Sequence, residues 1–213
     1  MIARTVLAPL MLLILCASAQ GNDTATRPGT GDLQHGARTA VQLCALCHTL
    51  KYMHYRDLTA LGFTGDEIKD MSGGRGLESE IASANSPEQA RALFGTIPPE
   101  LTLLAKAYDD EDHVYRFLTG FEKNAAGKIY NAIRPGTAMP DVLAYTEKQL
   151  PARRAQTQQR ARDVSDFLKW AADPRAPERR RLGWFVMGYL VLLTALLYLL
   201  KRKIWHRLDK PLD

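Results

Sequence analysis

Two cysteines and a histidine stand at a spacing that can hold a haem covalently. The run Cys44-Ala45-Leu46-Cys47-His48 has the Cys-x-x-Cys-His pattern of c-type haem attachment. Two thiols three positions apart on one helical turn can reach the two vinyl groups of one porphyrin. The imidazole of His48 then points at the iron as an axial ligand. The run therefore predicts one haem c, attached through two thioethers.

Two other kinds of site use paired cysteines, and both match this chain less well. A thioredoxin-like redox disulfide needs a surrounding βαβ pattern, which the sequence does not show. A structural zinc site needs a second pair of ligands, and no cysteine follows Cys47. The chemistry expected at this motif is therefore haem chemistry.

The open face of the iron needs a second ligand, and methionine is favoured. Methionine ligation stabilises ferrous iron and raises the potential relative to two histidines. Met139 stands far along the chain in a Pro/Gly loop that can fold over the haem edge, so we expect it to be the second axial ligand. Met71, beside a glycine-rich loop, stays open as an alternative. Met53 is too near His48 to reach the opposite haem face easily.

Three histidines outside the motif compete for the same position. His35 and His54 are close to the motif, and His113 stands in an acidic segment that we expect to be exposed. Lone histidines of this kind are more often solvated or packed than ligating. With a methionine as second ligand the iron is six-coordinate, which favours electron transfer over gas binding or substrate oxidation.

Helical patterns dominate the part of the chain that must position these residues. A first helix is expected to begin near Asp32, a good N-cap, and to lead into the haem motif. A helix that begins at Pro98 and a short one that Gly120 ends are expected in the middle. The last begins at about Gln156 and ends at Ala172. Its apolar positions recur at helical spacing, and they are Val164, Phe167, Leu168 and Ala171. Since strand signals are poor, the sequence predicts a mainly α fold.

Apolar runs at the two ends of the chain have different forms. Residues 1–19 resemble a secretory signal peptide, with Arg4, an apolar run and an Ala17-Ser18-Ala19 cleavage site. The run Leu182–Leu200 holds no charge and is close to the ~20 residues that a helix needs to cross a bilayer. The expected order is a signal peptide at 1–19, a periplasmic haem domain at 20–178, a transmembrane anchor with basic flanks at 179–203 and a cytoplasmic tail at 204–213.

The basic charge of the chain belongs to the membrane flanks rather than to the haem domain. The formal net charge is +5, yet residues 20–178 hold 19 Lys and Arg against 21 Asp and Glu. Basic residues at the flanks of a span are typical of contact with membrane lipid. The exported part shows no basic face with interleaved aromatic residues, so the sequence gives no support to nucleic-acid binding.

Several further runs recur in one family in the same order. They are Tyr55-Arg56-Asp57-Leu58, Pro98–Ala107, Tyr115–Phe121, Ala138-Met139-Pro140 and Asp163–Pro174, followed by one C-terminal anchor. Together with the haem motif, they make the chain resemble the cytochrome c1 family, the haem c subunits of the quinol–cytochrome c oxidoreductase (the cytochrome bc1 complex). The resemblance covers nearly the whole mature chain, although the polar stretch 149–162 departs from it.

The resemblance implies a class I cytochrome c fold with insertions and an electron-transfer role. It implies that Cys44 and Cys47 hold the haem, that His48 and Met139 are its axial ligands, and that Arg91 lies by a haem propionate. The expected electron path runs from the Rieske iron–sulphur protein through this haem to a soluble or membrane-bound cytochrome c. Cytochrome b is the other expected core partner, and the expected location is a bacterial inner membrane with the haem domain in the periplasm.

Other functions are compatible with the same haem motif. One is a free-standing, membrane-anchored cytochrome c that shuttles electrons to a terminal oxidase, and another is a gas sensor or peroxidase with an open iron. The acidic run Asp109–Asp112 has two possible interpretations. The favoured one is a solvated helix start, where carboxylates stabilise the positive end of the helix dipole. The other is a surface that attracts a basic cytochrome c over a long range.

Overall fold

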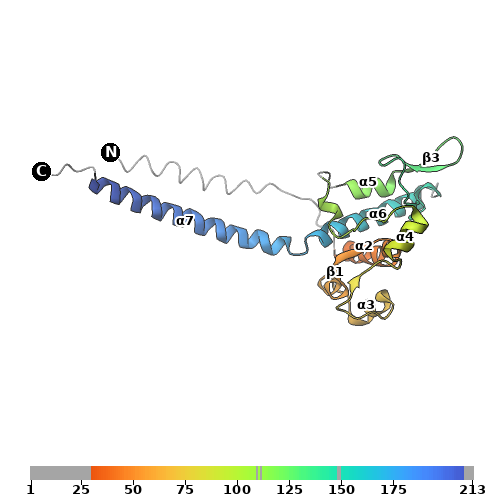
Figure 1. Ribbon diagram of the computed structural model, residues 1–213, viewed down its shortest axis with the longest axis horizontal. Coiled ribbons are helices and arrows are strands. Elements are labelled where there is room, and N and C mark those ends of the chain that lie inside the picture. The colour runs from red at the N-terminus through yellow and green to blue at the C-terminus, as the bar shows by residue number, and fades with distance from the viewer. Residues whose placement is uncertain (1–29, 109, 111, 148–149, 209–213) are drawn as a thin grey trace.

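The computed structural model describes residues 30–108, 110, 112–147 and 150–208. The signal peptide expected at residues 1–19 lies outside these ranges. The described chain forms a mainly helical domain, from which one long helix, α7 (Ala176–Leu208), projects as a rod (Figure 1). The two antiparallel sheets have two strands each, which agrees with the weak strand signals in the sequence. The fold is that expected of a class I haem domain with an apolar C-terminal helix.

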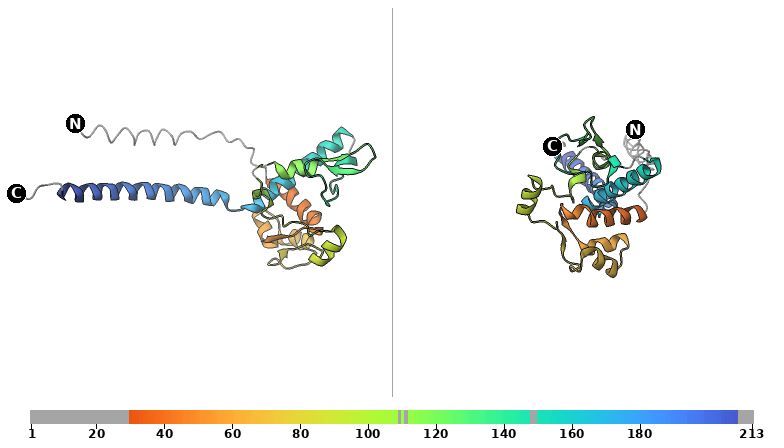
Figure 2. Two further views of the ribbon diagram at one scale, coloured as in Figure 1. Left: turned by 45° about the horizontal axis from the view of Figure 1, so that its top comes forward. Right: turned by 90° about the vertical axis from the view of Figure 1, so that its right-hand side faces the viewer.

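Helices α2 (Thr30–Gln42) and α6 (Pro151–Ala172) lie side by side at the centre of the domain (Figures 1 and 2). Gly36 allows this close approach, because a Cβ atom there would lie 2.1 Å from the backbone oxygen of Asp163. The almost fully buried Asp163 carboxylate also lies 2.5 Å from Nδ1 of His35. The two helices are thus joined by close backbone packing at Gly36 and by a polar contact between His35 and Asp163.

The apolar stripe predicted for the last helix is confirmed. Val164, Phe167, Leu168 and Ala171 are all buried in the core of the domain. The helix begins earlier than predicted, at Pro151, because proline is tolerated in the first helical turn, where its missing N–H has no intrahelical partner. The polar stretch 149–162 is therefore largely the exposed first half of this helix.

The chain leaves α2 before it reaches the haem motif. The predicted unbroken helix ends at Gln42, and a short 3₁₀ turn, η1 (Cys44–Leu46), carries the first cysteine. Strand β1 (Leu50–His54) follows and pairs with β2 (Glu80–Ile81). Between them lie the 3₁₀ segment η2 (Tyr55–Leu61) and helix α3 (Gly65–Ser72). The motif is therefore a tight turn between a helix and a strand.

The prediction of a helix that begins at Pro98 is wrong. The Leu101 N–H donates to the Thr49 carbonyl at 2.9 Å, so this segment runs beside the chain that follows the haem motif. The Glu100 carboxylate accepts hydrogen bonds from three backbone N–H groups, those of Lys51, Thr102 and Leu103. These contacts compete with helix formation, and only the short η3 (Leu104–Lys106) forms.

Helix α4 (Pro87–Phe94) has a clear capping signal in the sequence. Ser86 caps its N-terminus, Pro87 occupies the first turn, and the Gln89 side chain completes a capping box. The residues around α4 show little helical periodicity of apolar side chains. The capping residues are therefore the main indication of this helix in the sequence. The helix matters because it leads directly into one wall of the cavity described below.

The second half of the domain holds α5 (His113–Thr119), the hairpin of β3 (Phe121–Lys123) and β4 (Ile129–Asn131), and η4 (Tyr145–Glu147). Helix α5 stops at Gly120 as predicted. Of the acidic run before it, residues 109 and 111 lie outside the described ranges. Asp110 pairs with Arg116, and Asp112 accepts from Arg162 at 2.9 Å. Both described carboxylates therefore have cationic partners within the chain.

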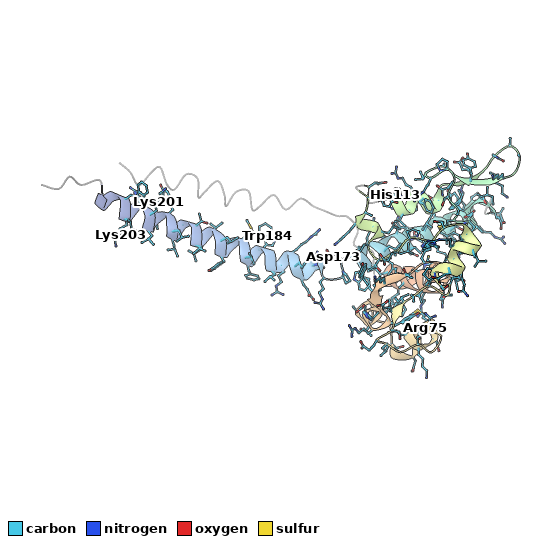
Figure 3. The ribbon with its side chains drawn as sticks, in the orientation of Figure 1. Arg75, His113, Asp173, Trp184, Lys201 and Lys203 are labelled. Carbon is cyan, nitrogen blue, oxygen red and sulfur yellow. The ribbon has the colours of Figure 1, made fainter. Side chains whose placement is uncertain are left out.

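The junction between the domain and α7 centres on Asp173 (Figure 3). Its carboxylate accepts from Nζ of Lys106 at 3.0 Å and also pairs with Arg179, the first basic flank of α7. Beyond this point, Ala176–Trp205 is long and apolar enough to cross a membrane, and its apolar side chains are exposed. The helix therefore has the length and composition that the sequence predicts for an anchor.

Candidate functional site

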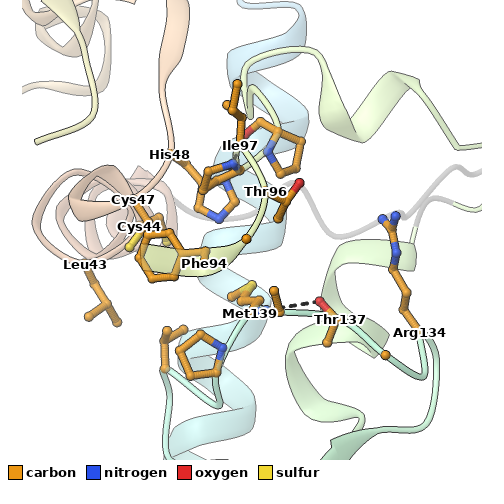
Figure 4. Close-up of a pocket in the computed structure, with 17 residues that line it drawn as sticks. Leu43, Cys44, Cys47, His48, Phe94, Thr96, Ile97, Arg134, Thr137 and Met139 are labelled. Atoms are coloured by element: carbon orange, nitrogen blue, oxygen red, sulfur yellow. Dashed lines mark hydrogen bonds between the residues drawn. The ribbon is translucent and has the colours of Figure 1, made fainter. Parts of the chain in front are cut away.

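The haem motif opens onto a cavity with a volume of about 550 Å³. This volume is within the roughly 300–1,000 Å³ typical of ligand sites. Three segments wall it, namely 43–48, 94–99 and 134–142 (Figure 4). A smaller, inner cavity of about 130 Å³ shares lining residues with this outer one, and apolar side chains of α5 and α6 form part of its wall. A flat, largely apolar group could therefore lie with one edge inside the domain.

Cys44 and Cys47 lie on the wall formed by the 3₁₀ turn. The N–H groups of Cys47 and His48 both donate to the Cys44 carbonyl, at 3.1 and 2.9 Å, which tightens the turn. Both cysteines are free thiols. Burial, followed by the proximity of Cys47, raises the pKa of Cys44 to about 11. At neutral pH the Cys44 thiol is therefore protonated, and its sulphur faces the cavity rather than a second thiol partner.

His48 has one ring nitrogen held by the backbone. Its Nδ1 lies 2.8 Å from the carbonyl oxygen of Pro99. Because a carbonyl can only accept, Nδ1 carries the proton and Nε2 keeps its lone pair. Burial lowers the pKa of His48, against a smaller opposing effect of the Pro99 hydrogen bond, and so favours the neutral imidazole. A neutral ring with one nitrogen fixed by a backbone acceptor is the usual form of a metal-ligating histidine.

Met139 comes to the same cavity from a chain segment 91 positions away from His48. In Figure 4 its side chain lies on the opposite side of the cavity from the His48 ring. Its backbone N–H donates to Oγ1 of Thr137 at 3.3 Å. Pro135 and Gly136, with φ of +82° at the glycine, form a turn that the Thr137 N–H closes onto the Arg134 carbonyl. This turn positions the thioether against the cavity.

The alternative methionines lie elsewhere. Met53 is 1% exposed in strand β1, where it packs into the core. Met71 is half-buried on α3 and packs against the outside of that core. Neither residue lines the two cavities that open beside His48. This arrangement favours Met139 over Met71, and the ligand assignment itself stays a prediction.

The three histidines outside the motif have three different surroundings. His35 contacts Asp163 in the α2–α6 interface. His54 lies at the end of β1, with Nδ1 3.9 Å from Asp57. His113 is not in the exposed position that the sequence suggests, since it lines the smaller cavity with its ring stacked on Tyr108 at a centroid distance of 3.6 Å.

Arg91, expected beside a haem propionate, is an exposed residue of α4 and does not line either cavity. Its role stays a prediction. Sequence reasoning missed several residues that do line the cavities, among them Phe94, Tyr108, Arg134 and Thr137. Arg134 and Thr137 could have been predicted, because they belong to the same Pro/Gly loop as Met139.

The side chains present fit the haem that the motif predicts. An imidazole and a thioether face each other across an open cavity, and two thiols border the same space. Imidazole nitrogen and thioether sulphur are the axial ligands of electron-carrying c-type cytochromes. Within the described ranges, no three His, Cys, Asp or Glu side chains gather as ligands of a metal ion held by protein alone. The arrangement suits a metal that arrives inside a planar ring.

Comparisons with known proteins give a consistent result. The model of the cytochrome C1 family matches residues 29–208. Cytochrome c1 of Rhodospirillum rubrum is 28% identical, over 96% of this chain and 97% of its own length. The mitochondrial haem protein cytochrome c1-2 of Solanum tuberosum is 32% identical, over 78% of this chain and 76% of its own. The protein of Bradyrhizobium diazoefficiens called cytochrome b/c1 is 28% identical over 82% of this chain, which corresponds to 33% of that longer protein.

Proposed function

The chain belongs to the cytochrome c1 family, and from this we propose that it is the haem-carrying electron-transfer subunit of a quinol–cytochrome c oxidoreductase. The observation that carries the proposal is the cavity in which His48 and Met139 face each other beside the two motif cysteines. A haem c bound there supplies one-electron chemistry, by alternating between ferric and ferrous iron. The chain itself makes or breaks no substrate bond.

Four side chains would have distinct tasks in this proposal. Cys44 and Cys47 would hold a haem c through two thioethers. His48 would offer Nε2 to the iron, because Pro99 holds Nδ1 in its protonated form. Met139 would offer its sulphur, and a haem held in this way would exchange electrons through its ring edge rather than at an open iron.

The cavity walls support an electron path through that edge. The inner part is lined by Val114, Phe117, Val164 and Leu168, which exclude water from one side of the ring. The outer part opens between the segments 94–99 and 134–140 and leaves Ile97 45% exposed. We infer that the Rieske iron–sulphur protein delivers electrons to this open side and that a soluble or membrane-bound cytochrome c removes them.

The membrane arrangement completes the proposal. Residues 1–19 would export the chain as a signal peptide, residues 20–178 would form the haem domain in the periplasm, and α7 would anchor it in a bacterial inner membrane. Export decides the orientation, because both ends of the span carry basic residues, Arg179–Arg181 on one side and Lys201–Lys203 on the other. Residues 204–213 would then lie in the cytoplasm, and cytochrome b would be the neighbour of α7 within the bilayer.

A test of the proposal is purification of the tagged full chain from gently solubilised membranes. We expect a cytochrome b and a [2Fe–2S] protein to co-purify, and added quinol to reduce the haem c only when both are present. A free-standing shuttle to a terminal oxidase, the alternative, predicts a chain that purifies without them. Purification of the haem protein alone from membranes in which quinol oxidation is intact would overturn the proposed membership.

A further inference from the structure

We propose that Arg134 binds the propionate edge of the haem and neutralises its charge. The inference rests on the proposed function only in requiring that a haem c occupies the cavity. Arg134 lines both the outer and the inner cavity, as do only a few other residues, among them His48 and Met139. A ring held between His48 and Met139 would therefore lie beside Arg134.

The orientation of a covalently attached ring follows from its chemistry. The two vinyl groups of the porphyrin lie on the edge opposite the two propionates, so the cysteines determine which edge points where. Figure 4 shows Arg134 across the cavity from Cys44 and Cys47. Thioethers at the cysteines therefore direct the two propionate carboxylates toward the Arg134 side.

The charges that line the cavity point to the same residue. Among the described residues that line either cavity, Arg134 carries the one permanent positive charge, and no Asp, Glu or Lys accompanies it. The two remaining basic side chains are His48, held by Pro99, and His113, stacked on Tyr108. A guanidinium offers parallel N–H donors that match a carboxylate, so it is the group best suited to a propionate.

Arg134 makes no ion pair with the described part of the chain, a property that it shares with several exposed arginines, among them Arg91. Over the described part of the chain, five arginines pair with a carboxylate, and they are Arg38, Arg56, Arg116, Arg162 and Arg179. No carboxylate among the described side chains lies within 4.0 Å of Arg134. Its guanidinium is therefore available to a carboxylate that the haem brings.

A buried side chain holds the Arg134 backbone in place. Asn131 is fully buried, and its Nδ2 donates to the Phe117 carbonyl at 2.8 Å. Its Oδ1 accepts from the N–H groups of Ile133 and Arg134, at 2.9 and 3.0 Å. The Arg134 carbonyl in turn accepts from the Thr137 N–H at 3.2 Å. The backbone at Arg134 is thus linked both to α5 and to the loop that carries Met139.

Arg91 is the rival candidate for this contact, since the sequence resemblance places it by a propionate, whereas in the structure it is exposed and lines neither cavity. An equilibrium redox titration of the full holoprotein in detergent, carried out on wild type, Arg134→Gln, Arg134→Lys and Arg91→Gln, tests the proposal. Reduction adds an electron beside the propionates, so loss of the neighbouring positive charge disfavours ferrous iron. At a fixed ambient potential, we expect the ferrous-to-ferric ratio to fall by about three- to tenfold in Arg134→Gln, the tenfold limit being about 59 mV for one electron. We expect it to stay within about twofold of wild type in Arg134→Lys and Arg91→Gln.

The ferrous-to-ferric ratios are compared only between proteins that hold the haem covalently and whose absorption spectrum shows Met139 ligation. A wild-type ratio in such an Arg134→Gln protein, or a fall in Arg91→Gln instead, would overturn the proposal. If Arg134→Gln yields no holoprotein, the reduced-minus-oxidised infrared spectrum of Arg134→Lys decides. Lysine replaces the two-pronged guanidinium of Arg134 by a single ammonium group, which should shift the infrared bands of the propionate carboxylates. Unshifted bands would contradict a contact between Arg134 and a propionate. None of these readouts needs quinol or a partner protein, so their failure leaves the proposed function standing.

Discussion

Nδ1 of His48 lies 2.8 Å from the carbonyl oxygen of Pro99, a residue 51 positions further along the chain. This contact selects the tautomer in which Nε2 is free to bind a metal. It also agrees with the absence of a helix at Pro98, because the Pro99 carbonyl accepts from His48 rather than from an N–H of a following helical turn. The Glu100 carboxylate keeps the segment there by accepting three backbone N–H groups. The first axial ligand is therefore oriented by a segment that the motif does not include.

Replacement of Met139 by leucine tests the second axial ligand. We expect Met139→Leu to lose the weak far-red absorption band that methionine gives with ferric haem, while the haem stays covalently attached. Its midpoint potential should fall, because a thioether stabilises ferrous iron. Met71→Leu is the matched control, since Met71 packs against the core away from the cavity and should keep both properties. Persistence of the band in Met139→Leu would refute the ligand assignment.

Substitution of the motif cysteines tests covalent attachment. The double variant Cys44→Ala, Cys47→Ala should retain no haem after denaturing electrophoresis, as judged by haem peroxidase staining. Each single variant should keep one thioether and a weaker stain. Cys16→Ala is the control, because Cys16 belongs to the predicted signal peptide and should leave the stain unchanged. Full staining of the double variant would mean that the haem is attached elsewhere.

Gly36 is expected to be the least replaceable glycine of the described domain. A Cβ atom there would lie 2.1 Å from the Asp163 backbone oxygen, so Gly36→Ala must push α2 and α6 apart. Overpacking of this kind destabilises by about 1–3 kcal/mol, or more, which should appear as a lower midpoint in denaturant-induced unfolding. Gly65→Ala is the control, since a Cβ there meets nothing within 4 Å. Equal midpoints for the two variants would show that the helices can separate without loss.

Asp173 should make the domain more stable at neutral than at acid pH. The hydrogen bonds from Arg179 and Lys106 lower the pKa of Asp173 below its ordinary value of 3.8, despite an opposing effect of desolvation. A lowered folded-state pKa gives stability that is complete above 3.8 and lost as the pH falls through the folded-state pKa. The unfolding free energy of wild type relative to Asp173→Asn should therefore shrink on acidification below 3.8.

Asp166 supplies the control of opposite sign. Burial raises the pKa of Asp166, with Lys169 opposing the effect, so its ionised form is disfavoured in the folded state. Relative to Asp166→Asn, wild type should lose stability as the pH rises above 3.8 and through the raised folded-state pKa. Equilibrium unfolding of both pairs between about pH 3 and pH 7 gives the two slopes. Slopes of the same sign would contradict the assigned environments.

Short patterns that act within one turn or one helix were predictable from the sequence. The spacing of Cys44, Cys47 and His48 specifies a cofactor chemistry because those three groups need only one turn to act together. The stripe on α6 was equally readable, since helical periodicity determines which face is apolar. The apolar run within α7 was readable for the same reason, because length and composition are local properties.

Local patterns misled where distant backbone groups compete for hydrogen bonds. Pro98 looks like a helix start, yet the chain there bonds to residues near the haem motif instead. His113 looks exposed because its neighbours in the sequence are acidic, whereas the packing of α5 turns it toward a cavity. At Pro98 the partners near the haem motif are tens of positions away, which no window of neighbouring residues can represent.

The sequence by itself determined which groups this protein has for holding a haem: two thiols, one imidazole and a methionine, with Met139 in a Pro/Gly loop preferred over Met71. Only the tertiary structure decided which of them meet. It brings Met139 to the cavity beside His48 and leaves Met71 outside, and it places Arg134 rather than Arg91 on the cavity wall. The physical reason is that a cavity is made by segments far apart in the chain. The closeness of those segments depends on the packing of α2, α5 and α6, not on their spacing in sequence.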